Sequence, residues 1–494
     1  MKKDEDILKY LQPSLEDARR RTRKVTKRTS FELDSEYLNL GNNKKYLIQT
    51  YGCQGNEADS EMIAGILEQM GFEKADSPED SDLIILNTCA IRENAENRIW
   101  GEVGRLSMYQ KTNPNLIIGV AGCMPQEPYV IERILKKQTN VGLVFGTHNI
   151  DLLPEYIKEA FFSKERVIEV YSKEGEIVEN LPKVRNHKFK AWVNIMFGCD
   201  EFCTYCIVPY TRGKERSRRP ESIIEEVKSL VKDGYQEITL LGQNVNAYGK
   251  DFQDIDYTLG DLLIALDQTG INRIRYTTSH PRDVDLKTVL AMRDCKSVMP
   301  HLHLPVQSGS DEVLRRMNRR YTKKMYMEKV NMLKEHVKGI SITTDIIVGF
   351  PEESDQDFIK TLELVKEADF EGAYTFIYSK RKGTPAASFP DSISNDVKKK
   401  RLLELNEHIN AGFKRGNMRF LNEVVEVLVD GPSEKNPEIL AGYSPHNKLV
   451  NFKGDQSLIG KIVKVKITKA LTWSLQGELY EEAWRIIRSN KKWS

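Results

Sequence analysis

The sequence has no long apolar run, few cysteines and almost no excess of charge of either sign. No stretch approaches the ~20 apolar residues of a membrane-spanning helix, and the highly charged start lacks the apolar core of a secretory signal. We therefore expect a cytoplasmic protein with no membrane partner. Lysine and arginine number 74 against 72 aspartates and glutamates, a net charge of +2, so composition neither requires nor excludes a nucleic-acid partner.

Seven cysteines are an odd number for a disulfide framework. In a reducing compartment, clustered cysteines more often bind metal or take part in catalysis. The chain of 494 residues is too long for one core and predicts roughly three domains. Residues 1–43 form a charged extension, in which seven of the ten residues from 19 to 28 are Lys or Arg. This arm is either solvated and partly disordered or rests on phosphate.

Between residues 44 and 162 a strand–helix unit repeats three times. Short continuous apolar strands that alternate with helical patterns indicate a parallel sheet. One cysteine follows each strand, and these are Cys53, Cys89 and Cys123, spaced 36 and 34 residues apart. Ligands bind at the carboxyl edge of open α/β sheets, so we expect the three thiols to converge there. A lone cysteine is structural by default, but three at equivalent positions favour a ligand set.

Residues 163–190 are polar and predict a linker, and from 191 to 415 strand and helix patterns alternate again. This run of βα units has the size and rhythm of a complete or partial (β/α) barrel of the TIM type. The expected strands are 191–197, 237–242, 273–277, 301–305, 341–347 and 373–378. The expected helices are 221–232, 258–268, 311–317, 323–337 and 355–367. The fold class is therefore multidomain α/β, with an all-β module at the C-terminal end.

That module covers residues 416–485, where apolar and polar residues alternate between turn signals, and a tail of 486–494 follows. Short alternating strands of this kind predict a small antiparallel β-barrel. Several lysines lie on one side of its strands, either as the wet face of an amphipathic strand or as RNA contacts. They are Lys461, Lys464, Lys466 and Lys469.

The strongest local signal is a C-x3-C-x2-C loop formed by Cys199, Cys203 and Cys206, directly after an expected strand. Three thiolates on one loop can bind three irons of a cubane cluster, because sulfur ligands favour iron–sulfur clusters or zinc. A structural zinc site needs a fourth ligand, and no His or further Cys lies close by in the sequence. Three ligands leave one iron open to an exchangeable ligand, although zinc or structural thiols stay as alternatives.

This spacing resembles the signature of radical S-adenosylmethionine (SAM) enzymes. The resemblance implies a [4Fe-4S] cluster whose open iron chelates SAM and whose reduction yields a 5′-deoxyadenosyl radical. It also implies that residues at the barrel's strand ends hold SAM. A glycine at one strand end is more often a turn, but these share one barrel edge. They are Gly242, Gln243, Asn244, Gln307, Ser308, Gly309, Asp345 and Gly349.

Longer phrases resemble the radical SAM methylthiotransferase family, and within it the MiaB type that modifies transfer RNA. The resemblance covers 45 to about 485 and implies that the C-terminal module is a TRAM domain, a small RNA-binding barrel. One departure is Gly55, where the family usually has Met. The matching phrases are Tyr51-Gly-Cys-Gln54, Asn87-Thr-Cys-Ala-Ile-Arg-Glu-Asn-Ala-Glu-Asn-Arg98, Cys203-Thr-Tyr-Cys-Ile-Val-Pro-Tyr-Thr-Arg-Gly213, His301-Leu-His-Leu-Pro-Val-Gln-Ser-Gly-Ser310 and Thr343-Thr-Asp-Ile-Ile-Val-Gly-Phe-Pro351.

The resemblance also implies a reaction. A second, auxiliary [4Fe-4S] cluster on Cys53, Cys89 and Cys123 would carry a sulfide that one SAM methylates. The radical from another SAM would take hydrogen from C2 of the substrate adenine, where the methylthio group is delivered. The implied substrate is N6-isopentenyladenosine at position 37 of tRNA, beside the anticodon. Besides this tRNA, the implied partners are an electron donor such as a flavodoxin or ferredoxin and a sulfur donor, and we expect a monomer.

Two basic clusters are candidates for RNA contact. Phosphate binding needs such charge density because each neutralised phosphate releases counterions, whereas the alternative is a solvated surface. The first cluster is Arg212, Lys214, Arg216, Arg218 and Arg219. The second is Arg315, Arg316, Arg319, Arg320, Lys323 and Lys324.

Two other functions stay open at this point. One is the same chemistry on threonylcarbamoyladenosine of tRNA or on an aspartate of a ribosomal protein. The other is a non-catalytic RNA-binding protein with structural metal, against which two three-cysteine sets without a fourth ligand count. Cys295 is expected to be an incidental free thiol. His301 and His303 share one strand face and either line the barrel or ligate metal.

Overall fold

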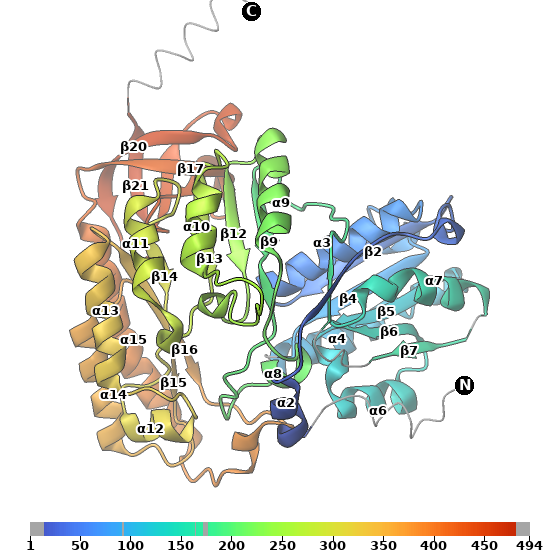
Figure 1. The fold of residues 1–494 in the computed structure, drawn as a ribbon, viewed down its shortest axis with the longest axis horizontal. Helices are drawn as coiled ribbons and strands as arrows, with labels where there is room; N and C mark the ends of the chain where they lie inside the picture. The colour runs from blue at the N-terminus through green and yellow to red at the C-terminus, as the bar shows by residue number, and fades with distance from the viewer. Residues whose placement is uncertain (1–13, 91–92, 164, 171–175, 481–494) are drawn as a thin grey trace, which may run out of the picture.

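The structure is a computed structural model, and it describes residues 14–90, 93–163, 165–170 and 176–480. An N-terminal α/β domain lies beside a central sheet-and-helix domain, and a small β-barrel lies at one end of the latter (Figure 1). This is the predicted order of fold types. The predicted tail 486–494 lies outside the described residues. Among the described residues, no helix combines the length and apolar character needed to cross a bilayer.

The N-terminal domain is a six-stranded parallel sheet with strand order β3-β2-β4-β5-β6-β7. Helices pack on both faces, so its central strands are buried on both sides, as their continuous apolar runs predict. The strands are β2 Lys45–Tyr51, β3 Glu73–Lys74, β4 Leu83–Thr88, β5 Ile117–Gly122, β6 Val141–Gly146 and β7 Val167–Glu169. The helices are α3 Gln54–Gln69, α4 Glu93–Leu106, α5 Tyr109–Thr112, α6 Pro128–Lys137 and α7 Leu153–Phe162.

The expected linker 163–190 takes part in two sheets. β7 extends the N-terminal sheet past the predicted boundary at 162, and β8 (Glu176–Glu179) pairs in parallel with β1 (Lys27–Ser30) of the N-terminal arm. Polar strands of this kind are held by backbone hydrogen bonds, which leave little trace in an apolar pattern. Residues 171–175 of the expected linker lie outside the described part of the chain.

The central domain has six parallel βα strands, all within two residues of their predicted bounds except β9, which ends at Asn194 rather than at the predicted residue 197. They form two three-stranded sheets, β13-β12-β9 and β14-β15-β16, in a partial rather than a closed barrel. The strands are β9 Lys190–Asn194, β12 Glu237–Leu241, β13 Arg273–Thr277, β14 His301–His303, β15 Ser341–Val348 and β16 Ala373–Ile377. The helices between them are α9 Pro220–Lys232, α10 Leu259–Asp267, α11 Leu286–Asp294, α12 Asp311–Arg316, α13 Lys323–His336 and α14 Asp355–Ala368.

The C-terminal module is a closed barrel with strand order β17-β18-β19-β21-β20. Its pairs are antiparallel except β19 with β21, which run parallel. Inward residues such as Val427, Val465 and Phe452 are buried. Helix α15 (Asn395–Met418) joins it to the central domain. The strands are β17 Val424–Ser433, β18 Asn436–Tyr443, β19 Leu449–Lys453, β20 Ile462–Ala470 and β21 Leu475–Leu479.

Candidate functional site

Three thiols converge at the carboxyl edge of the N-terminal sheet, as expected. Cys53, Cys89 and Cys123 follow the adjacent strands β2, β4 and β5. The backbone N–H of Cys89 donates to the Tyr51 carbonyl at 3.1 Å, and that of Cys123 donates to the Thr88 carbonyl at 2.9 Å. These bonds continue the sheet ladder by one residue, so each cysteine is placed by its strand. We name this group the auxiliary thiol site.

Buried amides fix the turn that carries Cys53. The Asn56 side chain donates to Asn87 Oδ1 at 3.1 Å, and the Asn87 amide donates to the Asn56 carbonyl at 2.8 Å and to Ser60 Oγ at 2.9 Å. Asn56 and Asn87 are fully buried. Satisfied polar networks of this kind hold a single geometry because breaking one bond leaves an unpaired buried group. The start of α3 is thereby locked to the end of β4.

A buried arginine from the central domain reaches the auxiliary thiol site. Arg212 Nε donates to the Cys123 sulfur at 3.2 Å, and Arg212 Nη2 donates to Asp59 Oδ2 at 2.6 Å. The neighbouring Cys89 thiol, with Arg212 adding to it, lowers the pKa of Cys53 to about 5, whereas burial raises that of Cys123 to about 11. Three soft thiol donors and a buried guanidinium fit an anionic iron–sulfur cluster.

Gly55 lies at this site, and a side chain there would meet two of its groups. A Cβ built on Gly55 lies 3.5 Å from the Cys53 sulfur and 3.6 Å from Arg212 Nη2, which is ordinary van der Waals contact. A methionine at this position would therefore cover Cys53 and Arg212. The departure from the family pattern thus leaves the thiols in place and uncovers one side of them.

The second thiol site is the loop that carries Cys199, Cys203 and Cys206. Gly198 precedes it with φ +78°, and a Cβ there would lie 2.0 Å from the Lys214 carbonyl oxygen, so only glycine fits this backbone crossing. The Cys206 N–H donates to the Cys203 carbonyl at 3.0 Å. Burial raises the pKa of Cys206 to about 12 and that of Cys199 well above its ordinary value, so metal binding here displaces protons.

The segment after α12 fastens this loop. Asn318 Nδ2 donates to the Phe202 carbonyl at 2.9 Å, and Arg319 Nη1 donates to the Cys203 sulfur at 3.3 Å. Arg319 is 5% exposed, which corrects its assignment to an exposed basic cluster. Each thiol site thus has one buried arginine that donates to one of its sulfurs. A buried positive charge stabilises a nearby thiolate or an anionic cluster.

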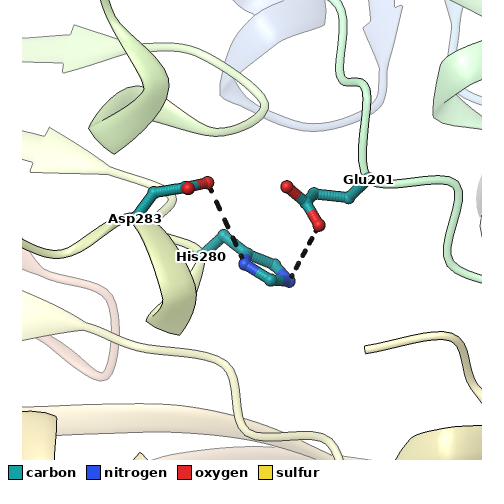
Figure 2. A group of neighbouring side chains, drawn as sticks. All are labelled: Glu201, His280 and Asp283. Atoms are coloured by element: carbon teal, nitrogen blue, oxygen red, sulfur yellow. Dashed lines mark ion pairs between the residues drawn. The ribbon is translucent and has the colours of Figure 1, made fainter. Parts of the chain in front are cut away.

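A polar cluster lies beside the cysteine loop, at the carboxyl end of β13. His280 Nε2 is 3.6 Å from Glu201 Oε2, and His280 Nδ1 is 4.0 Å from Asp283 Oδ2 (Figure 2). Among the residues that the structure describes, neither ring nitrogen of His280 has a hydrogen-bond partner, although the residue is only 4% exposed. A buried imidazole without hydrogen-bond partners is costly, and both of its nitrogens are available to a ligand.

The charges around this cluster decide what fits it. Arg282 pairs with Glu201, and Lys250 Nζ pairs with Asp283 Oδ1 at 2.5 Å. Burial, together with Arg319 and other cations, holds the pKa of His280 well below its ordinary value. Because both carboxylates already have cationic partners, the cluster has no unbalanced negative charge for a divalent metal. It suits a ligand with its own donors and acceptors instead. Sequence reasoning missed this cluster, although Glu201 lies inside the cysteine motif.

The predicted SAM-binding residues divide into three groups. Gln243 Oε1 accepts from the Gly198 N–H at 2.6 Å, and Asn244 Nδ2 donates to Asp283 Oδ2 at 2.7 Å, so both lie beside the cysteine loop, directly after Gly242. Gln307 and Asp345 are joined through the backbone, and His303 Nε2 lies 3.3 Å from Asp345 Oδ1. The remaining three, Ser308, Gly309 and Gly349, pack against α14 and α15 instead.

The first basic cluster is not the exposed surface that we predicted. Arg212, Lys214, Arg216 and Arg218 are 5–7% exposed. Arg218, for example, pairs with Glu226 at 2.7 Å, and Arg216 donates to the Glu176 carbonyl at 2.7 Å. Local composition showed their charge, but not the acids and carbonyls that tertiary folding brings to them. These four residues are therefore not available as surface contacts for RNA.

Other predicted basic residues stay at the surface. Arg219 is partly exposed and pairs with Asp254 at 2.7 Å. Lys464 and Lys466 are exposed on β20, with the buried Val465 between them, which is the alternation expected for an amphipathic strand. In the second cluster, Arg315 is exposed and pairs with Glu312. Lys464 and Lys466 therefore lie on the solvent-exposed face of β20.

The described part of the N-terminal arm, which begins at residue 14, covers the space between the two thiol sites. Helix α2 (Leu15–Arg21) packs Leu15 and Ala18 into an apolar cluster that holds Cys123 of one site and Phe202 of the other. Figure 1 shows α2 beside α8 (Val208–Thr211), between the two larger domains. Arg28 fastens the following strand, donating to the Ser217 carbonyl at 2.9 Å. The expectation of a disordered arm is therefore wrong for this part.

This position makes a testable prediction for the arm. Removing residues 1–22 deletes α2 and should expose Cys123, which is now 5% exposed. In the metal-free protein we expect alkylation of Cys123 to accelerate at least about tenfold, because protection falls with the contacts that cover a buried group. Peptide mass spectrometry over time measures the rate. Removal of residues 1–13 alone leaves α2 and is the control; equal rates for both truncations would show that α2 does not cover the thiol.

Profiles of three families match the chain in the order of its three domains. The family described as uncharacterized protein family UPF0004 matches residues 45–146, the radical SAM superfamily matches 193–365, and the TRAM domain matches 419–480. Each thiol site thus lies in its own matched domain, except that Arg212 crosses from the second to the first. The cysteine loop lies within the radical SAM match, which implies a [4Fe-4S] cluster and SAM as cofactors.

Curated relatives match almost the whole chain. The tRNA-2-methylthio-N(6)-dimethylallyladenosine synthase of Bacillus subtilis (strain 168) is 56% identical over 96% of this chain and 93% of its own length, and that of Bacillus cereus (strain B4264) is 55% identical over 97% and 96%. A solved radical SAM methyltransferase, TsrM from Kitasatospora setae, shares the fold with a TM-score of 0.51 at 14% identity, covering 70% of this chain and 77% of its own. The chain therefore belongs to the tRNA-2-methylthio-N(6)-dimethylallyladenosine synthase family of radical SAM enzymes.

Proposed function

We propose that this chain attaches a methylthio group to C2 of N6-isopentenyladenosine at position 37 of tRNA. The observation that carries the proposal is the pair of three-thiol sites, each facing one buried arginine, in a chain 56% identical to a synthase named for this product. That name also favours the isopentenyl substrate over threonylcarbamoyladenosine or a ribosomal-protein aspartate. We infer that the enzyme acts as a cytoplasmic monomer, with a flavodoxin- or ferredoxin-type electron donor and a separate sulfur donor.

Two [4Fe-4S] clusters fit the two thiol sites. Cys199, Cys203 and Cys206 would hold one, and the auxiliary thiol site would hold the other. Together with SAM, these groups supply a 5′-deoxyadenosyl radical for hydrogen abstraction and a methylthio group for transfer. Each site offers three thiols, so one position stays open to an exchangeable ligand. The residues that would position SAM are Gln243, Asn244 and Asp345, together with the His280 cluster.

The protein's own residues orient and shield these groups. Arg212 and Arg319 place a positive charge against one thiol of each site, which favours the bound, charged form. The unpartnered nitrogens of His280 can accept from or donate to a polar ligand beside the cysteine loop. Helix α2 and Phe202 cover the space between the sites with apolar side chains, which excludes water from a radical reaction.

The nucleosides of cellular tRNA test this function directly. Deleting the gene should remove 2-methylthio-N6-isopentenyladenosine and leave N6-isopentenyladenosine in its place, and the wild-type gene should restore it. Mass spectrometry of digested tRNA measures both nucleosides, with a gene copy that carries Cys53→Ala as the inactive control. Unchanged 2-methylthio-N6-isopentenyladenosine in the deletion strain would contradict the proposal, and loss of a different methylthio nucleoside would reassign the substrate.

A further inference from the structure

The last strand of the partial barrel exposes two aromatic rings. Tyr374 is 66% exposed and Phe376 is 44% exposed, both on β16. Among the described residues, β16 pairs with β15 and with no strand on its other side, so it is a sheet edge. Single exposed apolar side chains are common. Two large rings two residues apart on one face of an open edge are a feature that soluble proteins usually cover.

Both rings face the interior of the partial barrel. Thr375, between them, donates to Asn406 Oδ1 of α15 at 2.6 Å, so it points to the helical side. Successive residues of a strand point to opposite faces, which puts Tyr374 and Phe376 on the other one. There the Tyr374 ring lies 5.9 Å from the ring of His303, and Asp345 is its register partner on β15. The rings thus line the same space as the predicted SAM-binding residue Asp345.

The chain that leaves β16 is basic and leads toward the auxiliary thiol site. Lys380 and Lys382 are exposed. Arg381 lies between them and reaches Glu127 at 3.6 Å, four residues after Cys123. The Lys382 ammonium lies 5.1 Å from the centre of the Tyr129 ring on α6. Basic residues therefore lie directly after the two rings in the chain, on the segment that runs from β16 to the N-terminal domain.

We propose that Tyr374 and Phe376 form a stacking platform for unpaired bases of the tRNA loop, and that Lys380 and Lys382 hold the phosphates beside it. This inference rests on the proposed function and names how that substrate is held. Aromatic faces accept any unpaired base, and loops are the parts of RNA whose bases can be splayed out. A protein strand added at the β16 edge would bind through backbone hydrogen bonds and has no need of adjacent lysines.

Binding of a fluorescent RNA tests the platform. The RNA is an anticodon stem-loop with 2-aminopurine in the loop, and the protein is the full chain with its clusters reconstituted. The variant Tyr374→Leu with Phe376→Leu keeps apolar side chains but removes both rings. We expect affinity to fall about tenfold for each ring, because a stacked base contributes strongly to binding, and we expect the stacking quench of 2-aminopurine to disappear. The control is Phe162→Leu on α7, an exposed ring (70%) outside this surface, which should change neither readout.

The lysines have a different expected signature. Lys380→Gln with Lys382→Gln should reduce the salt dependence of RNA binding by about two phosphate contacts while the quench persists. Wild-type affinity and quench in the leucine variant would overturn the platform and assign the β16 edge to another occupant, such as a protein strand. If the wild-type enzyme forms no methylthio nucleoside in this RNA carrying N6-isopentenyladenosine, the proposed function fails. If it does form the nucleoside and the leucine variant still binds normally, only the platform fails.

Discussion

Replacing Cys199 with alanine is expected to remove about four of about eight irons per chain and to reduce SAM cleavage to background. Replacing Cys53 is expected to remove a similar amount of iron while SAM cleavage continues, now without methylthio transfer. The two substitutions differ because their thiols lie in separate domains at the ends of separate sheets. Iron and sulfide assays on anaerobically purified protein measure the clusters, and chromatography of 5′-deoxyadenosine measures the cleavage.

The seventh cysteine provides a matched control. Cys295 follows α11 and is 8% exposed, in the core of the central domain among apolar side chains. Cys295→Ala removes one buried sulfur with no neighbouring thiol, so it should keep its iron, its SAM cleavage and its methylthio transfer. Two results would contradict the assignment of clusters. One is stoichiometric zinc in the wild type, and the other is loss of all iron in every single cysteine variant, which would indicate general unfolding.

The convergence of Cys53, Cys89 and Cys123 was predictable because it depends on a local rule. Each cysteine follows its strand by one or two residues, and neighbouring parallel strands end at one edge. The strands and helices of the central domain were also predictable from local sequence, because the spacing of apolar residues within each segment indicates its secondary structure. Whether the barrel closes depends on the distance between β16 and β9, which is set by tertiary packing and not by the sequence of either strand. The open edge with Tyr374 therefore could not be predicted.

Tertiary partners explain the predictions that failed. Arg212 was placed on an RNA-binding surface because its neighbours in sequence are basic, yet its ion-pair partner Asp59 lies 153 residues away in another domain. Helix α2 buries only Ala18, so its apolar face was too short to be recognised in a sequence dominated by arginine. A cluster of basic residues in a sequence requires negatively charged partners. In this chain the protein's own carboxylates and thiols supply many of these partners, so phosphate is not needed for them.

Substituting Arg212 is expected to destabilise the protein and empty the auxiliary thiol site together. Arg212→Leu would leave Asp59, which is 2% exposed, without its cation. Removing one partner of a buried pair costs about 3–5 kcal/mol, which corresponds to a fall of roughly 6–20 °C in melting temperature for a domain of about 150–250 residues. We also expect about four irons to be lost, because the anionic group held by Cys123 loses its neighbouring positive charge. Thermal unfolding and iron analysis measure the two effects. The control is Arg219→Leu, which removes a partly exposed surface ion pair worth at most about 1 kcal/mol.

A double substitution separates the two effects. In Arg212→Leu with Asp59→Asn the buried carboxylate no longer needs a cation, so most of the lost melting temperature should return. The iron should stay low, because the guanidinium that donates to the Cys123 sulfur is still missing. If iron returns together with stability, Arg212 serves only the fold, and the cluster depends on the three thiols alone. If neither returns, the guanidinium itself packs the domain interface, and an Arg212→Lys variant, which keeps the charge but not the planar fork, should then be as unstable as Arg212→Leu.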